Sequence, residues 1–266
     1  MERQQESDRV WTTLVERQTP QIERYACREY LEGFAILDLP SSHVPSLEFL
    51  NQAITPRTGW RLERTPIRYS DAVPWYRHFA RKIFLITNYM RSWEELDFTP
   101  EPDMFHDMFG HLPFMVLPAY TALQEIFGPA FLRTDAEHRE QIKRLAWFTT
   151  EFGMIREGGG LKVFGAGLLS SVGEIRHVME GRTPILPFSI ENVIKHTKAI
   201  YTYNETLFAI ESLAALKEEL SGYFATLPIA APETDTAPDA PIEDWELDDL
   251  VGAPGAPRPA SAVSPA

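Results

Sequence analysis

The sequence contains almost no cysteine, and this scarcity excludes several kinds of structure. Cys27 is the only cysteine in 266 residues, so the chain can form neither an internal disulfide nor a zinc site built from cysteines. A lone thiol fits a reducing compartment. We therefore predict a cytoplasmic protein.

The sequence also lacks long hydrophobic runs and an excess of positive charge. No apolar stretch approaches the roughly 18 residues that cross a bilayer, and the polar start of the chain has no apolar segment typical of a secretory signal. The formal net charge of −13 argues against binding to nucleic acid or to an anionic membrane surface. We expect no nucleic-acid partner and no membrane partner.

Enough apolar residues are present for a sizeable core, and the composition divides the chain into three parts. Hydrophobic residues make up 44% of the chain, which is ordinary for a globular protein. We predict an N-terminal helical extension over residues 1–58, packed on a main domain over residues 59–226. Residues 227–266 contain eight acidic residues against one arginine, with much proline and alanine, which predicts a disordered tail.

The pattern of apolar residues predicts a mainly α-helical protein with a few short strands. The first thirty residues are expected to be helical, with Pro20 breaking or starting a helix. Thr134 and Glu137 form a capping-box pattern, which opens a long helix that ends near residue 158. Further helices are expected near residues 41–53, with a cap at Ser41 or Ser42, and at residues 74–91, 102–110, 119–132, 168–179 and 212–223, with strands at residues 59–64 and 161–164.

Two histidines, His106 and His111, lie five positions apart in an apolar stretch. On an ideal α-helix, residues five apart point about 140° away from each other, so these side chains would not share a face. Gly110 and Pro113 indicate that the helix ends or bends near the second histidine, which would bring His111 back towards His106. A histidine pair of this kind is more often an ordinary structural feature than a metal site.

A second apolar run, residues 145–155, contains Glu151 as its one acidic residue. A helix of this composition is expected to be buried, and a buried carboxylate needs an arginine, a proton or a metal ion as its partner. Two histidines and one carboxylate are the ligand set of a mononuclear non-haem iron site, which leaves coordination positions open for oxygen chemistry. Trp147 lies four residues before Glu151, on the same helical face.

Four sequence blocks resemble the biopterin-dependent aromatic amino acid hydroxylases, in the order and with the spacing of that family. The blocks are residues 99–103, residues 106–111, residues 147–153, and residues 165–171 with Glu174. The resemblance covers about residues 59–224 and is greatest to the short bacterial phenylalanine hydroxylases. It implies a mainly α-helical, basket-shaped catalytic domain over residues 59–226, acting as a monomer.

The resemblance also implies a chemistry. It assigns Fe(II) to His106, His111 and Glu151, and it implies that a tetrahydropterin and dioxygen provide the oxidant that hydroxylates the ring of an aromatic amino acid. The expected reaction is phenylalanine to tyrosine. Pro100 and Glu101 would lie beside the iron and gate the activation of oxygen.

Further residues match positions that bind the substrate or the pterin in the family. Arg91, Thr99 and Ser170 would face the substrate carboxylate, which a guanidinium can bind with two parallel hydrogen bonds. The other matches are Trp147 and Phe152 in the aromatic wall of the substrate pocket, and Trp75, Asp107 and Ala146 beside the pterin. Without the resemblance, Arg91 fits an ordinary salt bridge, and the aromatic residues fit core packing.

The expected pterin site is where the sequence departs from the family. Residues 65–71 replace a loop with a Gly-Leu-Leu pattern, and Arg68 stands where a glycine would allow close approach of the backbone. Two alternatives therefore remain open. One is a non-haem iron oxygenase that acts on another aromatic substrate or has an altered or absent pterin requirement, and the other is a non-catalytic metal-binding relative.

Overall fold

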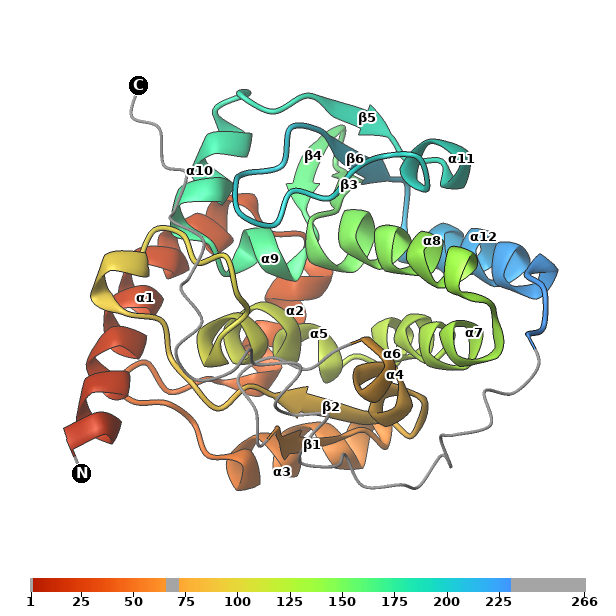
Figure 1. The fold of residues 1–266 in the computed structure, drawn as a ribbon. Coiled ribbons are helices and arrows are strands. Elements are labelled where there is room, and N and C mark those ends of the chain that lie inside the picture. Colours follow the sequence, from red (N-terminus) through yellow and green to blue (C-terminus); the bar gives the residue numbers. More distant parts are fainter. Residues whose placement is uncertain (1, 66–71, 231–266) are drawn as a thin grey trace, which may run out of the picture.

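The structure is a computed structural model, and it describes residues 2–65 and 72–230. The loop around Arg68 and the acidic tail from residue 231 lie outside the described residues. As predicted, the described chain is mainly helical with a few short strands. Figure 1 shows a four-stranded sheet at one end of the molecule and a two-stranded sheet at the other, with helices packed between them. None of the helices in these two ranges is both long and apolar enough to cross a membrane.

The first three helices share one hydrophobic core with the rest of the chain. They are α1 (Glu2–Tyr25), α2 (Arg28–Leu37) and α3 (Leu47–Thr58). The ring of Trp11 on α1 lies 5.4 Å from that of Phe105, and the Tyr30 hydroxyl on α2 donates to the Phe109 carbonyl at 2.6 Å. These helices therefore support the segment that carries His106 and His111, while a boundary at residue 59 stays a prediction.

Two details of the N-terminal helices differ from the sequence prediction. The helix α1 continues through Pro20 without a break. The cap of α3 is Ser46, whose side chain accepts from the Phe49 amide, and neither Ser41 nor Ser42 has this role. The predicted helix therefore starts later in the chain, and it ends at Thr58 before Gly59, whose φ of 75° suits a glycine at a helix end.

The two-stranded sheet corrects the helix predicted over residues 74–91. The helix α4 (Ala72–Ala80) is shorter, and β2 (Ile83–Ile86) follows it. β2 pairs in parallel with β1 (Arg61–Arg64), which agrees with the predicted strand there. All four residues of β2 are buried, and a short apolar run buried on both faces fits a strand better than the continuation of an amphipathic helix.

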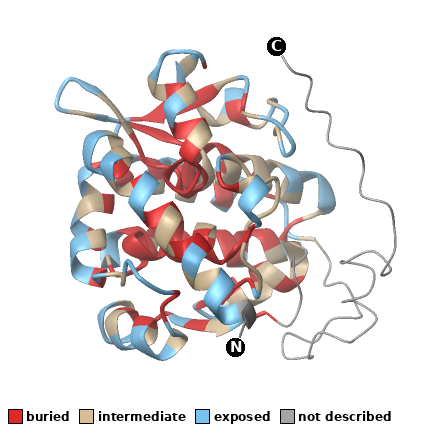
Figure 2. Ribbon diagram, turned by 90° about the vertical axis from the view of Figure 1, so that its left-hand side faces the viewer, coloured by how far each residue is buried: buried red, intermediate tan, exposed pale blue. Residues whose placement is uncertain are grey.

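A central helical stretch runs from Met104 to Met115 and contains the π-helix His106–His111 followed by α5 (Leu112–Met115). Next come α6 (Pro118–Gln124) and α7 (Phe127–Arg133), so the helix predicted over residues 119–132 is divided in two. A short 3-10 helix, Trp93–Glu95, precedes this region. Figure 2 shows that buried residues are concentrated in the middle of the molecule.

The next helix is also shorter than predicted. The helix α8 (Ala136–Ala146) continues as the π-helix Trp147–Glu151, and the strands β3 (Met154–Glu157) and β4 (Gly160–Val163) then form an antiparallel pair. The chain turns at Gly153, where a Cβ would lie 2.3 Å from the Thr149 carbonyl oxygen, so only glycine fits this turn. The cap of α8 is Asp135, whose carboxylate accepts from the His138 amide, and not Thr134.

The remaining elements complete the four-stranded sheet and cover it. They are α9 (Ala166–Leu169), α10 (Val172–Met179), β5 (Ile185–Pro187), α11 (Ile190–Val193), β6 (Leu207–Ile210) and α12 (Leu213–Thr226). The strand order is β4-β3-β6-β5. After α12 the chain returns to the start of α8, where the Ala230 amide donates to the Arg133 carbonyl at 2.8 Å. The disorder of the tail beyond this point stays a prediction.

Candidate metal centre

Both segments that carry the candidate metal ligands are π-helices, one over His106–His111 and the other over Trp147–Glu151. In a π-helix the hydrogen bonds join residues five apart, as in the bond from the Phe152 amide to the Trp147 carbonyl. This arrangement brings His106 and His111 onto one side of their helix. The helix does not end at Gly110, as one of the two expected alternatives had it, but continues to Met115. The expected return of His111 towards His106 is confirmed, and the wider π-helical turn accounts for it.

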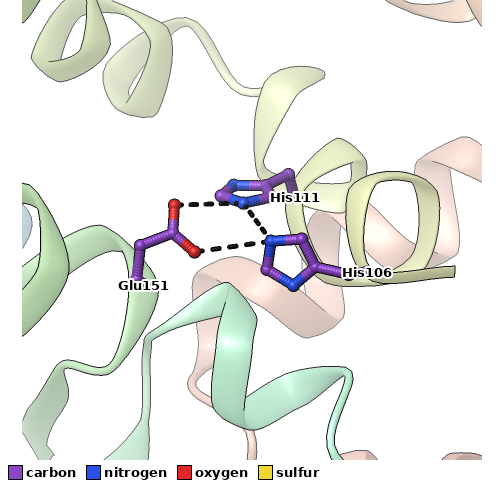
Figure 3. A group of neighbouring side chains, drawn as sticks. All are labelled: His106, His111 and Glu151. Atoms are coloured by element: carbon purple, nitrogen blue, oxygen red, sulfur yellow. Dashed lines mark hydrogen bonds and ion pairs between the residues drawn. The ribbon is translucent and has the colours of Figure 1, made fainter. Parts of the chain in front are cut away.

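The three candidate ligands converge on one point (Figure 3). The Nε2 atoms of His106 and His111 lie 3.1 Å apart, and those atoms lie 3.5 Å and 3.2 Å from the two Glu151 carboxylate oxygens. Ligand atoms about 2.1 Å from an octahedral ion, at right angles to one another, are separated by about 3.0 Å. The spacing of the three donors therefore fits one face of a six-coordinate ion, and the donor set suits Fe(II).

No other group of three such ligands is found among residues 2–65 and 72–230. The Glu151 side chain is 26% exposed, and the His111 side chain is 8% exposed. The site is therefore recessed but open on the carboxylate side. An ion held there would keep coordination positions on the side away from the protein ligands.

The protonation of His106 is set by Ser170. The Ser170 hydroxyl donates to the Ala166 carbonyl at 2.8 Å, so it accepts from Nδ1–H of His106, which is 2.9 Å away. This bond leaves the Nε2 lone pair of His106 pointing at the site, as a metal ligand requires. Burial and the charge of His111 lower the pKa of His106 to about 4, which keeps the imidazole neutral near pH 7.

His111 and Glu151 form a proton-sharing pair in the protein without metal. Burial lowers the pKa of His111, but the charge and hydrogen bond of Glu151 outweigh it and raise that pKa above its ordinary value. Burial raises the pKa of Glu151, and the charge of His111 and its hydrogen bond outweigh this effect and lower it. A metal cation that binds here would displace this proton and would then be the positive partner of the same carboxylate.

Two glycines, one in the 106–111 block and one in the 165–171 block, let α9 approach both helices that carry the candidate ligands. A Cβ at Gly110 would lie 2.6 Å from the Ala166 carbonyl oxygen, and a Cβ at Gly165 would lie 2.3 Å from the Glu151 carbonyl oxygen. Neither distance is compatible with a side chain. The two π-helices are therefore held together through close backbone contacts on α9, which fixes the separation of the ligands.

Arg91, predicted to bind the substrate carboxylate, lies in a buried ion pair. Its Nε and Nη2 donate to the two carboxylate oxygens of Asp103 at 2.9 Å and 2.8 Å, and its Nη1 donates to the Ser170 carbonyl at 3.3 Å. The two side chains are 1% and 0% exposed. Burial raises the pKa of Asp103, but the Arg91 charge outweighs it and holds that pKa below its usual range.

The same carboxylate links the ion pair to the metal site, because Asp103 also accepts from the His106 amide at 3.0 Å. Sequence reasoning assigned no role to Asp103. The sequence pattern could have indicated this role, because Asp103 directly precedes the apolar Met104 and Phe105. A carboxylate buried with such residues needs a partner.

The predicted aromatic wall lies beside Glu151. The rings of Trp147 and Phe152 are 4.5 Å apart at an angle of 38°, and both residues are partly exposed. The Lys198 ammonium lies 5.9 Å from the centre of the Trp147 ring. The two aromatic residues thus form a contacting pair at the two ends of the π-helix that carries Glu151.

Each of the residues predicted beside the pterin has its own packing partners in the structure. Trp75 packs on Phe84 with ring centres 5.2 Å apart, and Phe84 packs on His111 at the same distance. The Asp107 carboxylate is buried and accepts from the Thr87 amide at 2.7 Å, and burial raises its pKa to about 7. Ala146 is a partly exposed residue at the end of α8.

The predicted oxygen-gating residues form a turn just before the metal-bearing helix. The Glu101 carbonyl accepts from the Thr99 hydroxyl at 3.0 Å and from the Tyr89 hydroxyl at 3.2 Å. Pro100 lies between Thr99 and Glu101 and is partly exposed, as they are. The Thr99 hydroxyl is therefore engaged within the turn.

Comparison with known proteins gives a consistent result. The chain matches the sequence model of the family "Biopterin-dependent aromatic amino acid hydroxylase" over residues 1–231. The phenylalanine-4-hydroxylase of Chromobacterium violaceum is 32% identical over 224 residues, which cover 84% of this chain and 75% of that protein. The phenylalanine-4-hydroxylase of Mesorhizobium japonicum is 34% identical over 218 residues, covering 80% and 78%.

Solved structures agree over most of the fold. The structure of C. violaceum phenylalanine hydroxylase with bound oxidized Fe(III) has a TM-score of 0.78 and 30% identity, and the match covers 89% of each chain. A structure of the same enzyme with iron(III) and oxidized 7,8-dihydrobiopterin has a TM-score of 0.77 and 30% identity, covering 88% of this chain and 87% of that one.

Proposed function

The chain belongs to the biopterin-dependent aromatic amino acid hydroxylases, and we propose from this premise that it converts phenylalanine to tyrosine with Fe(II) held by His106, His111 and Glu151. Membership makes the protein a non-haem iron monooxygenase that uses a tetrahydropterin and dioxygen on an aromatic amino acid. The finer points, the substrate and the residue roles, rest on the similarity to phenylalanine hydroxylases and on the geometry above.

The observation that carries the proposal is the spacing of the three donors. Two imidazole nitrogens and one carboxylate lie 3.1–3.5 Å apart and face the same point. When bound, the iron and the pterin supply the reductive activation of dioxygen, by which one oxygen atom enters the aromatic ring. The protein supplies the three ligands on one side and leaves the opposite side for the reactants.

The surrounding residues bind and orient. Ser170 keeps Nε2 of His106 unprotonated by accepting from Nδ1–H, and the Trp147 and Phe152 rings hold the substrate ring and exclude water from it. Arg91 has five N–H donors, of which three are used by Asp103 and Ser170. We assign the other two to the substrate carboxylate, which would have to enter beside a side chain that is 1% exposed, and Asp103 would orient the guanidinium for this contact.

We also propose that the protein works as a monomer in the cytoplasm. The bacterial phenylalanine-4-hydroxylases that resemble it support a bacterial type of enzyme acting on a free amino acid. Light scattering of the purified protein would give its mass in solution, and fractionation of the producing cells would give its location. A stable dimer or a membrane-bound fraction would contradict this part of the proposal.

The experiment that tests the function is a turnover assay with defined components. Purified protein is loaded with Fe(II) without oxygen, then given oxygen and phenylalanine with and without tetrahydropterin, and the products are identified by mass spectrometry. We expect pterin-dependent addition of one oxygen atom at the para position. Iron binding without a pterin-dependent product would instead favour the oxygenase with another reductant or substrate, and failure to bind iron would favour the non-catalytic relative.

A further inference from the structure

A buried chain of hydrogen bonds leads from α10 to the wall of the proposed substrate pocket. Glu174 on α10 is 2% exposed, and Asn204 in the loop before β6 is 4% exposed. Oε1 of Glu174 accepts from the Asn204 backbone N–H at 3.0 Å and from its side-chain Nδ2 at 2.9 Å. The indole N–H of Trp147 donates to Oδ1 of Asn204 at 2.9 Å.

The carboxylate determines how the Asn204 amide is turned. Oε1 of Glu174 already accepts from the Asn204 backbone N–H, so it acts as an acceptor and the NH₂ end of the Asn204 amide must face it. The carbonyl end then faces Trp147, whose indole can only donate. Without Glu174 only the indole N–H would hold the amide in this orientation, since a flip would set two donors against each other there.

Close packing holds the two ends of this path in place. A Cβ at Gly173 would lie 2.2 Å from the Tyr203 hydroxyl oxygen, so the loop carrying Asn204 rests directly on the first turn of α10. The Gly173 amide donates to the Asp97 carbonyl at 2.9 Å, and the Ser171 side chain caps α10 by accepting from the Glu174 amide. Glu174 is therefore a fixed point from which Asn204 can be oriented.

We propose that Glu174 and Asn204 are positioning residues that set the plane of the Trp147 indole and thereby limit which aromatic ring the pocket accepts. The inference rests on the proposed function, in which Trp147 lines that pocket. An indole held at its N–H cannot turn about its side-chain bonds, so it keeps its 4.5 Å contact with Phe152. Trp147 also begins the π-helix that ends at the proposed metal ligand Glu151. The aromatic wall of the pocket and this ligand therefore belong to one helical segment.

The test compares two substitutions of Glu174 in two backgrounds. Glu174→Leu removes the acceptor, and Glu174→Gln keeps a carbonyl acceptor of the same length. Each is made in the natural sequence and in the Trp147→Phe variant, whose ring has no N–H to be held. The steady-state constants for phenylalanine, and the turnover of tryptophan relative to phenylalanine, are measured with the Fe(II)-loaded, pterin-supplied enzyme.

We expect Glu174→Leu to raise KM for phenylalanine about tenfold with a smaller change in kcat, and to increase the relative turnover of tryptophan. Glu174→Gln should recover most of the difference. In the Trp147→Phe background, Glu174→Leu should change KM by less than about twofold, since the path no longer ends at an indole. An equal rise of KM in both backgrounds, or no recovery by glutamine, would overturn the proposal.

A readout without turnover separates this inference from the proposed function. Hydrogen exchange at the Trp147 indole N–H is followed by NMR, with the signal identified by its loss in Trp147→Phe. The exchange should be at least tenfold faster in Glu174→Leu, whether or not the protein hydroxylates phenylalanine, and an unchanged rate would contradict the inference. If Glu174→Leu does not fold, Asn204→Ala is used instead, because it removes only the acceptor of Trp147. We expect it to raise KM for phenylalanine and to speed exchange of the indole N–H in the same way.

Discussion

The Nε2 atoms of His106 and His111 lie 3.1 Å apart although the two residues are five positions apart in the sequence. A π-helix makes this possible, because its hydrogen bonds join residues at that separation. The same geometry recurs at Glu151, the last residue of the second π-helix. Both helices are packed against α9 by glycines, so the three ligands are brought together before any ion binds.

Removing a ligand should abolish the retention of iron. Glu151→Ala and His106→Ala each leave two ligands, and the remaining donors cannot form the three-ligand face. We expect iron content after gel filtration to fall from about one ion per chain to near zero, with loss of turnover. His177→Ala, which changes a histidine on α10 outside the triad, serves as the control. Full iron content in His106→Ala would contradict the site.

Ser170→Ala should weaken iron binding without removing a ligand. The substitution removes the acceptor of Nδ1–H on His106, so the ring can change its tautomer or rotate. Loss of such a supporting hydrogen bond typically lowers metal affinity by about 10- to 100-fold. The neighbouring Ser171→Ala removes the α10 cap, which costs about 1 kcal/mol of stability, and it should leave the affinity unchanged. Titration with Fe(II) against a competing chelator measures both variants.

Arg91→Ala should affect stability as well as substrate binding. It leaves the Asp103 carboxylate buried without its charge partner, which costs about 3–5 kcal/mol of unfolding free energy. Chemical denaturation measures this loss. The double variant Arg91→Leu with Asp103→Leu should regain much of the stability, since it buries no lone charge, but it should not regain a normal KM for phenylalanine. A normal KM in the double variant would remove Arg91 from the substrate site.

Gly110→Ala should destabilise the protein and disturb the iron site. Its Cβ would lie 2.6 Å from the Ala166 carbonyl oxygen, so α9 would have to move away from the metal-bearing helix, at a cost of about 1–3 kcal/mol. Gly222→Ala is the matched control on α12, because nothing lies within 4 Å of its Cβ position. It should be neutral or stabilise by up to about 1 kcal/mol. Thermal unfolding and iron affinity are compared for the two variants.

Iron affinity should fall as the pH is lowered. His111 has a raised pKa because of Glu151, so a proton competes with the metal as soon as the pH falls through that pKa. His106, with a pKa of about 4, should add no competition until far lower pH. Calorimetry in buffers of different ionisation enthalpy should therefore detect release of a proton when iron binds at a pH below the pKa of His111. Binding without proton release would contradict the proton-sharing pair.

The sequence by itself determined the choice of candidate ligands and the class of chemistry. His106, His111 and Glu151 stand in blocks whose residue types and order are specific, so they could be selected from the order of the amino acids alone. The helical character of the chain could also be predicted, because apolar periodicity is a local property. The helix α12 lies close to its predicted range for this reason, whereas the helix predicted over residues 168–179 is divided between the end of α9 and α10.

Only the tertiary structure decided how these residues meet. Nothing in the sequence distinguished a π-helix from a bent α-helix at Gly110, because the choice depends on the packing of α9 more than fifty residues later. The strand β2 replaced part of a predicted helix because its apolar residues are buried on both faces by other segments. The hydrogen-bond partners of Arg91 and Trp147 could not be predicted from the sequence either. The hydrogen bond between Asn204 and Trp147 joins two distant positions, and neither local sequence indicates the other as its partner. Only the folding of the chain brings them together.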